Sequence, residues 1–303
     1  MKNTAVQPEF VEFQTKDGLT LPGLLYKAKK GKAVAICLHG MGSSVFYNKA
    51  KNSILASAWA EKNISTLYFN NRGAHVIKNL YVKRGNKDER KLFGMAYEKI
   101  KECVPDIDGA ISFLKERGYR EFYLIGTSTG ANKICVYNFY KPKNDIKKYV
   151  LLCGGDDTGI YYDILGKSRF SRLLSEAKRK IKAKRGGEII KEILPDEIFS
   201  YAGFYDAANP DGDYNTFPFY EVLRKKKLST KPLFRYFKSI KKQSLVVYGD
   251  KDQYAWGNVP KIVEILKQYQ PKLDYRIIKG ADHGFKGREK QLAKTIADWL
   301  SRG

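Results

Sequence analysis

Ser128 lies at the centre of a pattern, Gly126-Thr127-Ser128-Thr129-Gly130, that can make a serine nucleophilic. The apolar run 122–125 precedes this pattern, and a helix-like stretch follows it. A strand, G-x-S-x-G and a helix form a nucleophile elbow, a sharp turn that lifts the serine hydroxyl clear of the backbone. The glycines matter because the strained turn leaves no room for side chains beside the serine. The sequence therefore predicts Ser128 as a catalytic nucleophile.

A serine hydroxyl needs a base to take its proton, and the chain has only three histidines. His39 follows an apolar run, and His75 lies in a loop. His283 follows the last predicted strand, so it lies at the carboxyl edge of a parallel sheet, the edge that also carries Ser128. We therefore predict His283 as the general base.

A histidine base needs a carboxylate that holds its tautomer and stabilises the imidazolium. The segment after the run 245–248, Gly249-Asp250-Lys251-Asp252, offers two carboxylates at the same edge. We predict Asp252, because the loop needs a few residues to turn toward its neighbour, and we keep Asp250 as the alternative. Asp282, next to His283, is expected to make a local turn bond instead.

Acyl transfer places negative charge on the former carbonyl oxygen, which backbone N–H groups can stabilise. The residue after the nucleophile, Thr129, offers one such group. The loop His39-Gly40-Met41-Gly42 offers the other, and we place it at Met41, since Gly40 and Gly42 let the backbone come close. Met41 and Thr129 form the predicted oxyanion hole.

The elements that must position these groups follow from the apolar pattern. Two alternating runs, 11–15 and 19–26, flank an Asp-Gly turn and predict an antiparallel hairpin. Unbroken apolar runs typical of buried parallel strands lie at 33–38, 65–70, 121–125, 148–153, 244–248 and 274–278. Helical patterns alternate with them at 46–62, 97–117, 129–140, 258–269 and 287–300. This alternation predicts an α/β fold with a mostly parallel, doubly wound sheet and an N-terminal antiparallel hairpin.

One interval between predicted strands, near 150 to 246, is far longer than a single crossover helix needs. The stretch 173–194 looks helical around a Gly-Gly break, and 201–220 is aromatic and rich in turn residues. We expect a helical cap insertion over 156–243. The core would then comprise 1–155 and 244–303.

With these motifs in order, the chain resembles the serine-hydrolase branch of the α/β-hydrolase superfamily from about residue 10 onward. The resemblance rests on His39-Gly40, Asn71-Arg72-Gly73, the elbow, Gly249-x-x-Asp252 and Gly280-Ala281-x-His283. Within that branch it is most similar to single-domain carboxylesterases, acylglycerol lipases and feruloyl-type esterases with an inserted cap. The chain departs from the family pattern at Asn70, where relatives carry Asp, and at Thr127, where many carry His. The resemblance implies no metal and no organic cofactor.

The net charge of +24 invites a nucleic-acid interpretation, which the charge distribution does not favour. The segment 156–243 holds the densest basic runs, yet its 19 basic and 12 acidic residues give +7. An even spread of the charge, 24 × 88/303, gives about the same value. A nucleic-acid groove would concentrate the charge, so we expect no specific nucleic-acid partner.

The positions of the cysteines and of the apolar runs indicate the cellular compartment, and other motifs indicate whether a cofactor is bound. The four cysteines form no C-x-x-C pair, and three lie inside apolar runs, which suits reduced thiols in the cytoplasm. The sequence has no secretory signal pattern and no apolar run long enough to span a bilayer. It lacks zinc-ligand spacing and nucleotide-binding glycine motifs. Cys153 has no histidine reserved for it, so we expect a core thiol there.

Taken together, these patterns predict a serine enzyme that cleaves a small-molecule carboxylic ester through an acyl-enzyme intermediate. Three alternatives stay open: a thioesterase or acyltransferase, a peptidase or amidase of the same fold, and a non-catalytic binding protein. The sequence decides neither the acyl and alcohol specificity nor the oligomeric state.

Overall fold

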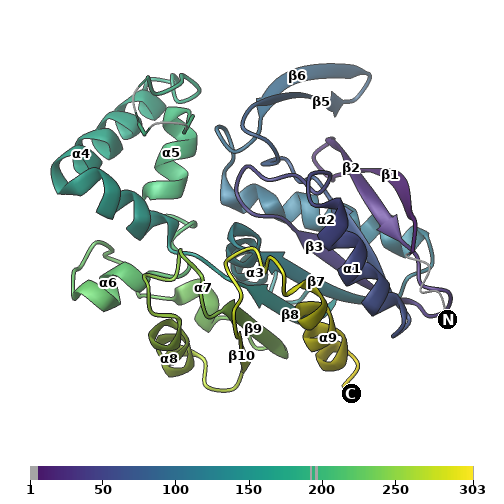
Figure 1. Cartoon of the computed structure of the whole chain (residues 1–303). Coiled ribbons are helices and arrows are strands. Elements are labelled where there is room, and N and C mark those ends of the chain that lie inside the picture. Colours follow the sequence, from purple (N-terminus) through teal and green to yellow (C-terminus); the bar gives the residue numbers. More distant parts are fainter. Residues whose placement is uncertain (1–5, 192, 195–196, 303) are drawn as a thin grey trace.

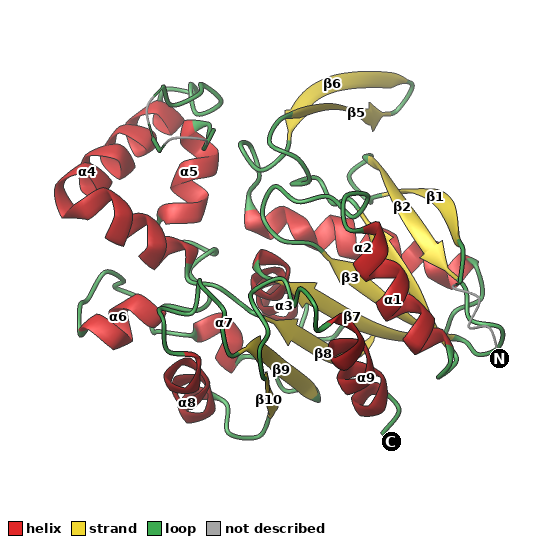
Figure 2. Ribbon diagram, viewed as in Figure 1, coloured by secondary structure: helices red, strands yellow, loops and turns green. Residues whose placement is uncertain are grey.

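The computed structural model describes residues 6–191, 193–194 and 197–302. Its strands are β1 (Pro8–Gln14), β2 (Thr20–Tyr26), β3 (Ala33–Leu38), β4 (Ile64–Phe69), β5 (Lys78–Arg84), β6 (Lys87–Phe93), β7 (Glu121–Thr127), β8 (Ile146–Leu152), β9 (Ser244–Gly249) and β10 (Asp274–Ile278). Its helices are α1 (Lys49–Ala60), the short 3-10 helix η1 (Ile100–Glu102), α2 (Cys103–Glu116), α3 (Thr129–Tyr140), α4 (Asp157–Lys182), α5 (Tyr201–Ala208), α6 (Phe219–Arg224), α7 (Arg235–Lys238), α8 (Val259–Tyr269) and α9 (Glu289–Leu300). Figures 1 and 2 show their arrangement.

Eight of the strands form one sheet in the order β1-β2-β4-β3-β7-β8-β9-β10. β2 pairs antiparallel with both β1 and β4, whereas the remaining pairs of this sheet are parallel. The turn between β1 and β2 contains Gly18, whose φ of 90° lies in the left-handed region that favours glycine. The predicted fold, a mostly parallel sheet with an N-terminal antiparallel hairpin, is confirmed.

The parallel strands form the hydrophobic core. Every residue of β4 and of β9 is buried, as expected where crossover helices cover both faces of a sheet. α1 packs against α9, and α2 packs against α3. The indole of Trp59 on α1 donates to the carbonyl of Ala293 on α9 over 3.2 Å. Because the parallel strands run in one direction, the loops after β3, β7, β9 and β10 all leave from the same edge of the sheet.

The hairpin of β5 and β6 was not predicted from the sequence. Its strands are rich in charged residues, and of its side chains only that of Val82 is buried. It makes a separate two-stranded sheet whose turn contains Gly85, with a φ of 59°. Figure 2 shows it projecting from the body near β1 and β2.

The segment between β8 and β9 holds α4, α5, α6 and α7, and in Figure 1 α4 and α5 stand beside the sheet. The helix predicted over 173–194 begins earlier, at Asp157, and ends at Lys182, with a break at Gly166, where φ is 70°. Asp156 explains the early start, because its carboxylate accepts from the N–H of Gly159 over 2.8 Å and caps the helix. Among the described residues, no helix combines the length and apolarity that crossing a bilayer requires.

The aromatic residues of 201–220 are mostly buried and pack against one another. Phe217 and Phe219 stack with ring centroids 5.8 Å apart, and Phe219 contacts Phe234 at 5.7 Å. Phe234 in turn stacks on Tyr269 of α8 at 4.2 Å. This chain of aromatic contacts joins the part of the segment around α6 and α7 to a helix of the sheet domain.

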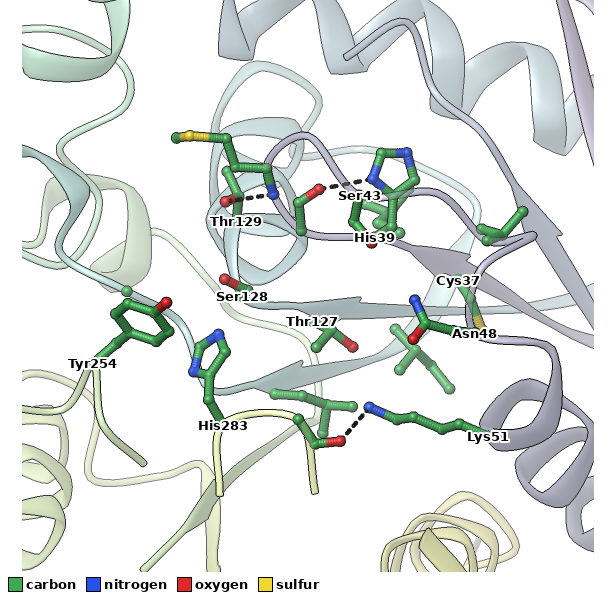
Figure 3. Close-up of a pocket in the computed structure, with 18 of the residues that line it drawn as sticks. Cys37, His39, Ser43, Asn48, Lys51, Thr127, Ser128, Thr129, Tyr254 and His283 are labelled. Atoms are coloured by element: carbon green, nitrogen blue, oxygen red, sulfur yellow. Dashed lines mark hydrogen bonds between the residues drawn. The ribbon is translucent and has the colours of Figure 1, made fainter. Parts of the chain in front are cut away.

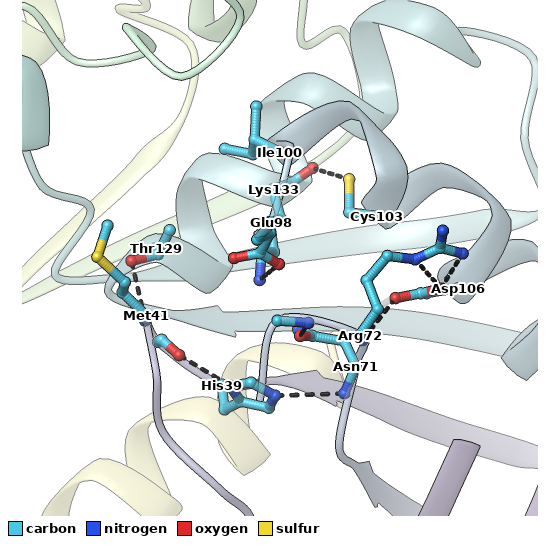
Figure 4. Close-up of polar contacts among 12 residues, drawn as sticks. His39, Met41, Asn71, Arg72, Glu98, Ile100, Cys103, Asp106, Thr129 and Lys133 are labelled. Atoms are coloured by element: carbon cyan, nitrogen blue, oxygen red, sulfur yellow. Dashed lines mark hydrogen bonds and ion pairs between the residues drawn. The ribbon is translucent and has the colours of Figure 1, made fainter. Parts of the chain in front are cut away.

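A buried ion pair ties the loop after β4 to α2 (Figure 4). The Arg72 guanidinium donates to Asp106 Oδ1 from Nε at 2.9 Å and from Nη2 at 2.7 Å, and the side chains are only 4% and 1% exposed. Burial raises the pKa of Asp106, and the neighbouring Arg72 opposes that rise. Arg72 also bonds Asp17 in the turn between β1 and β2. It therefore joins three parts of the chain that lie far apart in sequence.

Replacing Arg72 by Met should destabilise the fold strongly, because Asp106 would stay buried without its cation. We expect Arg72→Met to lower the free energy of unfolding by about 3–5 kcal/mol in denaturant titration. The matched control, Arg117→Met, removes a half-exposed ion pair with Glu9 and should cost about 1 kcal/mol or less. Equal losses in the two variants would contradict this interpretation.

Candidate active site

Ser128 occupies the turn between β7 and α3 with a φ of 57° and a ψ of −126°. A non-glycine residue with positive φ is strained, as a nucleophile elbow requires. The flanking glycines have no space for a side chain: a Cβ at Gly126 would lie 2.2 Å from Gly130 O, and one at Gly130 would lie 2.4 Å from Leu38 O. The sequence pattern thus corresponds to a tight turn that admits only glycine two positions before and two positions after the serine.

The structure brings His283 and Asp252 together. His283 Nδ1 lies 2.9 Å from Asp252 Oδ1, and Asp252 is 4% exposed. With Asp252 ionised, Nδ1 carries the proton and donates it, which leaves Nε2 as the free acceptor. The two residues lie in the loops that follow β10 and β9.

The two other carboxylates near His283 have different partners. Asp250 Oδ1 accepts from the N–H of Gly280 over 2.6 Å and so braces the loop that carries the histidine. Asp282 Oδ1 accepts from the N–H of Lys286 over 2.8 Å, a local bond of the kind expected from the sequence. Neither carboxylate is hydrogen-bonded to the imidazole.

Ser128 and His283 line the same cavity of about 460 Å³ (Figure 3). In this view the imidazole ring and the Ser128 side chain both face the cavity. Tyr254, which also lines the cavity, packs against the imidazole in a T-shaped arrangement with ring centroids 4.7 Å apart. The elements that carry these groups are far apart in sequence and meet at the carboxyl edge of the sheet.

Met41 and Thr129 line the cavity next to Ser128, but the Met41 N–H group is engaged. It donates to the hydroxyl of Thr129 over 3.1 Å, a contact that the sequence did not reveal. The Thr129 N–H group is the first of α3, so it has no acceptor within the helix. Gly40 approaches closely, since a Cβ there would lie 3.1 Å from Ser128 Cβ. Met41 and Thr129 therefore stay the predicted oxyanion hole, with the Met41 N–H already paired to the threonine hydroxyl.

His39, the other histidine of the cavity wall, holds the backbone (Figure 4). Its Nδ1 lies 2.8 Å from Gly40 O, and its Nε2 accepts from the N–H of Asn71 over 3.3 Å. Burial lowers the pKa of His39 to about 3, so the ring stays neutral at physiological pH. Next to it, Asn70 accepts from the N–H of Val45 over 2.9 Å, so the Asn-for-Asp departure here serves loop packing.

Several residues of the cavity wall were not identified from the sequence. Asp157 and Tyr161 come from α4, Glu197 from the segment that follows it, and Lys51 from α1. Burial raises the pKa of Asp157 to about 6, an effect that the nearby His283 opposes. No motif marks these positions, because each is a single residue in a helix or turn. Only their place beside the cavity distinguishes them.

The Cys153 thiol lies close to the histidine and its carboxylate. Cys153 Sγ, Asp252 and His283 offer ligand atoms within 4.8 Å of one another. Burial raises the pKa of Cys153 well above its usual value, and the Asp252 carboxylate raises it further. The thiol is therefore protonated and a poor nucleophile at neutral pH.

Comparison with known proteins identifies the family. The model of the family described as "Protein of unknown function (DUF1749)" matches residues 93–301, well over half of the chain. The chain belongs to this family. No curated protein matches the chain significantly.

Solved structures similar to this member of the family share its fold. Est1E from Butyrivibrio proteoclasticus with ferulic acid bound is 13% identical, with 95% of this chain and 97% of that chain covered and a TM-score of 0.61. The Pyrococcus furiosus esterase Pf2001 is 18% identical, with coverages of 98% and 92% and a TM-score of 0.56. The α/β hydrolase GrgF from Penicillium sp. sh18 is 15% identical, with coverages of 97% and 98% and a TM-score of 0.65. This likeness confirms the α/β-hydrolase fold.

The four cysteines of this chain should be unreactive in the native state. All four are free and buried, and burial raises the pKa of each thiol. We expect no reaction with Ellman's reagent at pH 8 in buffer and four thiols per chain in guanidinium chloride. A thiol that reacts rapidly in buffer and maps to Cys153 would instead indicate an activated cysteine beside Asp252 and His283.

Proposed function

We propose that the protein is a serine hydrolase that cleaves carboxylic esters through an acyl-enzyme intermediate. The observation that carries the proposal is the hydrogen bond between His283 and Asp252 at the wall of a cavity that Ser128 also lines. The strained turn at Ser128 and the α/β-hydrolase fold support it. The fold alone hosts many functions, so the argument rests on these residues.

In the proposed reaction, Ser128 Oγ attacks the acyl carbonyl carbon while His283 Nε2 takes the hydroxyl proton. The Nδ1–H of His283 donates to Asp252, which fixes the tautomer and stabilises the imidazolium that forms. The imidazolium then gives its proton to the leaving alcohol. Water attacks the acyl-enzyme with His283 again as base, which releases the acid and restores Ser128.

The oxyanion formed at each step would accept from the N–H groups of Thr129 and Met41. Each such donor contributes a few kcal/mol to stabilisation of the transition state. Since Met41 N–H donates to Thr129 Oγ1 in the free protein, the oxyanion replaces that hydroxyl as its acceptor. Thr129 thus keeps the donor satisfied and oriented until substrate arrives.

The segment 156–243 would act as the cap of the cavity, with 1–155 and 244–303 as the hydrolase core. Asp157, Tyr161 and Glu197 come from this segment and line the cavity. A cavity of about 460 Å³ has the size of a small-molecule site, so the substrate would be a small ester. Four free cysteines suit the reducing cytoplasm as the compartment.

Removing the nucleophile should abolish turnover. We expect Ser128→Ala to lower kcat for p-nitrophenyl esters by at least about 1,000-fold, because no acyl-enzyme can form. Circular dichroism and thermal unfolding should show an intact fold. A fluorophosphonate probe should label the wild type and Ser43→Ala, whose serine also lines the cavity, but not Ser128→Ala. Undiminished turnover in Ser128→Ala would refute the proposal.

The two carboxylates of the loop after β9 provide a matched test of the acid. Asp252→Asn should lower kcat by about 100-fold or more, because an amide cannot stabilise the imidazolium and favours the wrong tautomer. Asp250→Asn should stay within about threefold of wild type, since the amide oxygen still accepts from Gly280 N–H. Steady-state kinetics with p-nitrophenyl acetate measure both. The reverse order would assign the role to Asp250.

A further inference from the structure

The loop that carries His283 is held by contacts on two sides, and α1 provides the contacts on one side. We propose that Lys51 of α1 is a positioning residue that holds this histidine loop, residues 280–289, so that the imidazole faces Ser128. The proposal rests on the function proposed above. It concerns a residue that touches neither the reacting serine nor the imidazole.

The hydrogen bond and the ring contact of the Lys51 ammonium both lie on the histidine loop. Its Nζ donates to the carbonyl of Gly284 over 2.8 Å (Figure 3) and lies 5.6 Å from the ring centroid of Phe285. The carboxylates of Asp282 and Glu289 attract it at longer range, and neither forms an ion pair with it. A single side chain of α1 thus meets the residue after His283 and the residue after that.

Besides the bonds of His283 to Asp252 and of Gly280 N–H to Asp250, two further hydrogen bonds join this loop to the loop after β9. Gln253 Oε1 accepts from the N–H of His283 over 3.3 Å, and the N–H of Lys251 donates to Ala281 O over 2.9 Å. Both partners belong to the loop after β9. Around Gly284 the packing is open, because a Cβ there would meet only Asp282 Oδ1, at 3.6 Å. Among the described residues, the side chain of Lys51 therefore gives this part of the loop its hydrogen bond from α1, beside the buried ring of Phe285.

The first two turns of α1 also hold the loop that follows Met41. Asn52 Nδ2 donates to Val45 O over 2.9 Å, and Asn48 Nδ2 lies 3.4 Å from Ser44 O. Lys51 lies between these two asparagines in sequence, but its side chain extends toward Gly284 on the histidine loop. One rigid helix end thus fixes the distance between the predicted oxyanion loop and the histidine loop.

The use of a charged side chain here needs a reason, since burial of an ammonium is costly. Burial lowers the pKa of Lys51, and this effect is opposed by Cys153 and then by Glu289 and Asp282 on the loop. Phe285 is fully buried with a positive φ of 57°, so the loop takes a strained path at this point. An ammonium that donates to the Gly284 carbonyl and lies near the Phe285 ring, with the loop carboxylates at longer range, would stabilise that path better than a neutral side chain.

The test compares Lys51→Met, which keeps the length and apolar stem, with Lys51→Arg, which keeps the charge and a donor. Lys49→Met, at an exposed position of the same helix, is the control. With p-nitrophenyl acetate, we expect kcat of Lys51→Met to fall 10- to 100-fold with KM within threefold, because a misplaced base slows the chemical step. Lys51→Arg should recover most of the loss, and Lys49→Met should match wild type.

Hydrogen exchange followed by mass spectrometry tests the positioning itself, whether or not the ester assay succeeds. Amides of 280–289 should exchange at least fivefold faster in Lys51→Met than in wild type, while those of 250–256 stay unchanged. If wild type fails to hydrolyse esters yet this exchange pattern appears, the proposed function fails and the positioning role stands.

Three outcomes would overturn the proposal. A kcat within twofold of wild type in Lys51→Met, with unchanged exchange, would show that the loop needs no such support. A raised KM with unchanged kcat would make Lys51 a substrate-binding residue. Failure of Lys51→Arg to recover activity, together with a lowered melting temperature in both variants, would reduce its role to general stability.

Discussion

The hydrogen bond of 2.9 Å between His283 and Asp252 depends on a constraint of the whole sheet. β9 and β10 are neighbouring parallel strands, so the loops that follow them leave from the same edge and can exchange contacts. β7 and β3 end at this edge too, which brings Ser128 and the Met41 loop beside the histidine. Strand direction therefore makes possible a bond between side chains 31 residues apart and places it on the same edge as a serine in mid-chain. Any change that altered the order of these strands would separate the groups.

The close packing of the turn at Ser128 further restricts where the serine can lie. Gly130 lies against the backbone of Leu38 at the end of β3, so the turn after β7 and the loop after β3 touch through backbone atoms. Larger side chains at these positions would push the two loops apart. The glycines thus set the spacing between the serine and the backbone N–H groups around it, and the backbone strain at Ser128 persists because the neighbouring strands fix both sides.

How far the sequence predicts this arrangement depends on which interactions shape each part. The strands of the core were predicted to within two or three residues, because burial on both faces leaves unbroken apolar runs. The hairpin 78–93 was missed, because its strands are held by backbone bonds and carry charged side chains. The helix predicted over 173–194 was displaced, since the cap at Asp156 and the break at Gly166 decide its bounds. The apolar pattern thus predicts the buried strands of the core. It does not predict element bounds that are set by local hydrogen bonds.

The same distinction between sequence pattern and local hydrogen bonds applies to the residues of the site. Ser128 and His283 could be predicted as a pair, because one lies in a distinctive turn and few histidines compete for the other role. The choice between Asp250 and Asp252 depends on the path of a four-residue turn, in which the structure directs one carboxylate to Gly280 and the other to His283. The bond from Met41 N–H to the Thr129 hydroxyl depends on a side-chain rotamer, which no sequence pattern encodes.

The cavity wall that comes from 156–243 adds an electrostatic effect to the proposed chemistry. The chain carries a net charge of +24, yet this wall presents the carboxylates of Asp157 and Glu197. With a pKa of about 6, Asp157 is mostly ionised at pH 7 and mostly neutral at pH 5. A positive charge on His283 favours the ionised form of Asp157. In the proposed reaction, this wall therefore places a second carboxylate near the charge that His283 acquires, in addition to Asp252, which accepts from Nδ1. The charge of this second carboxylate is lost as the pH falls through 6, because Asp157 becomes protonated.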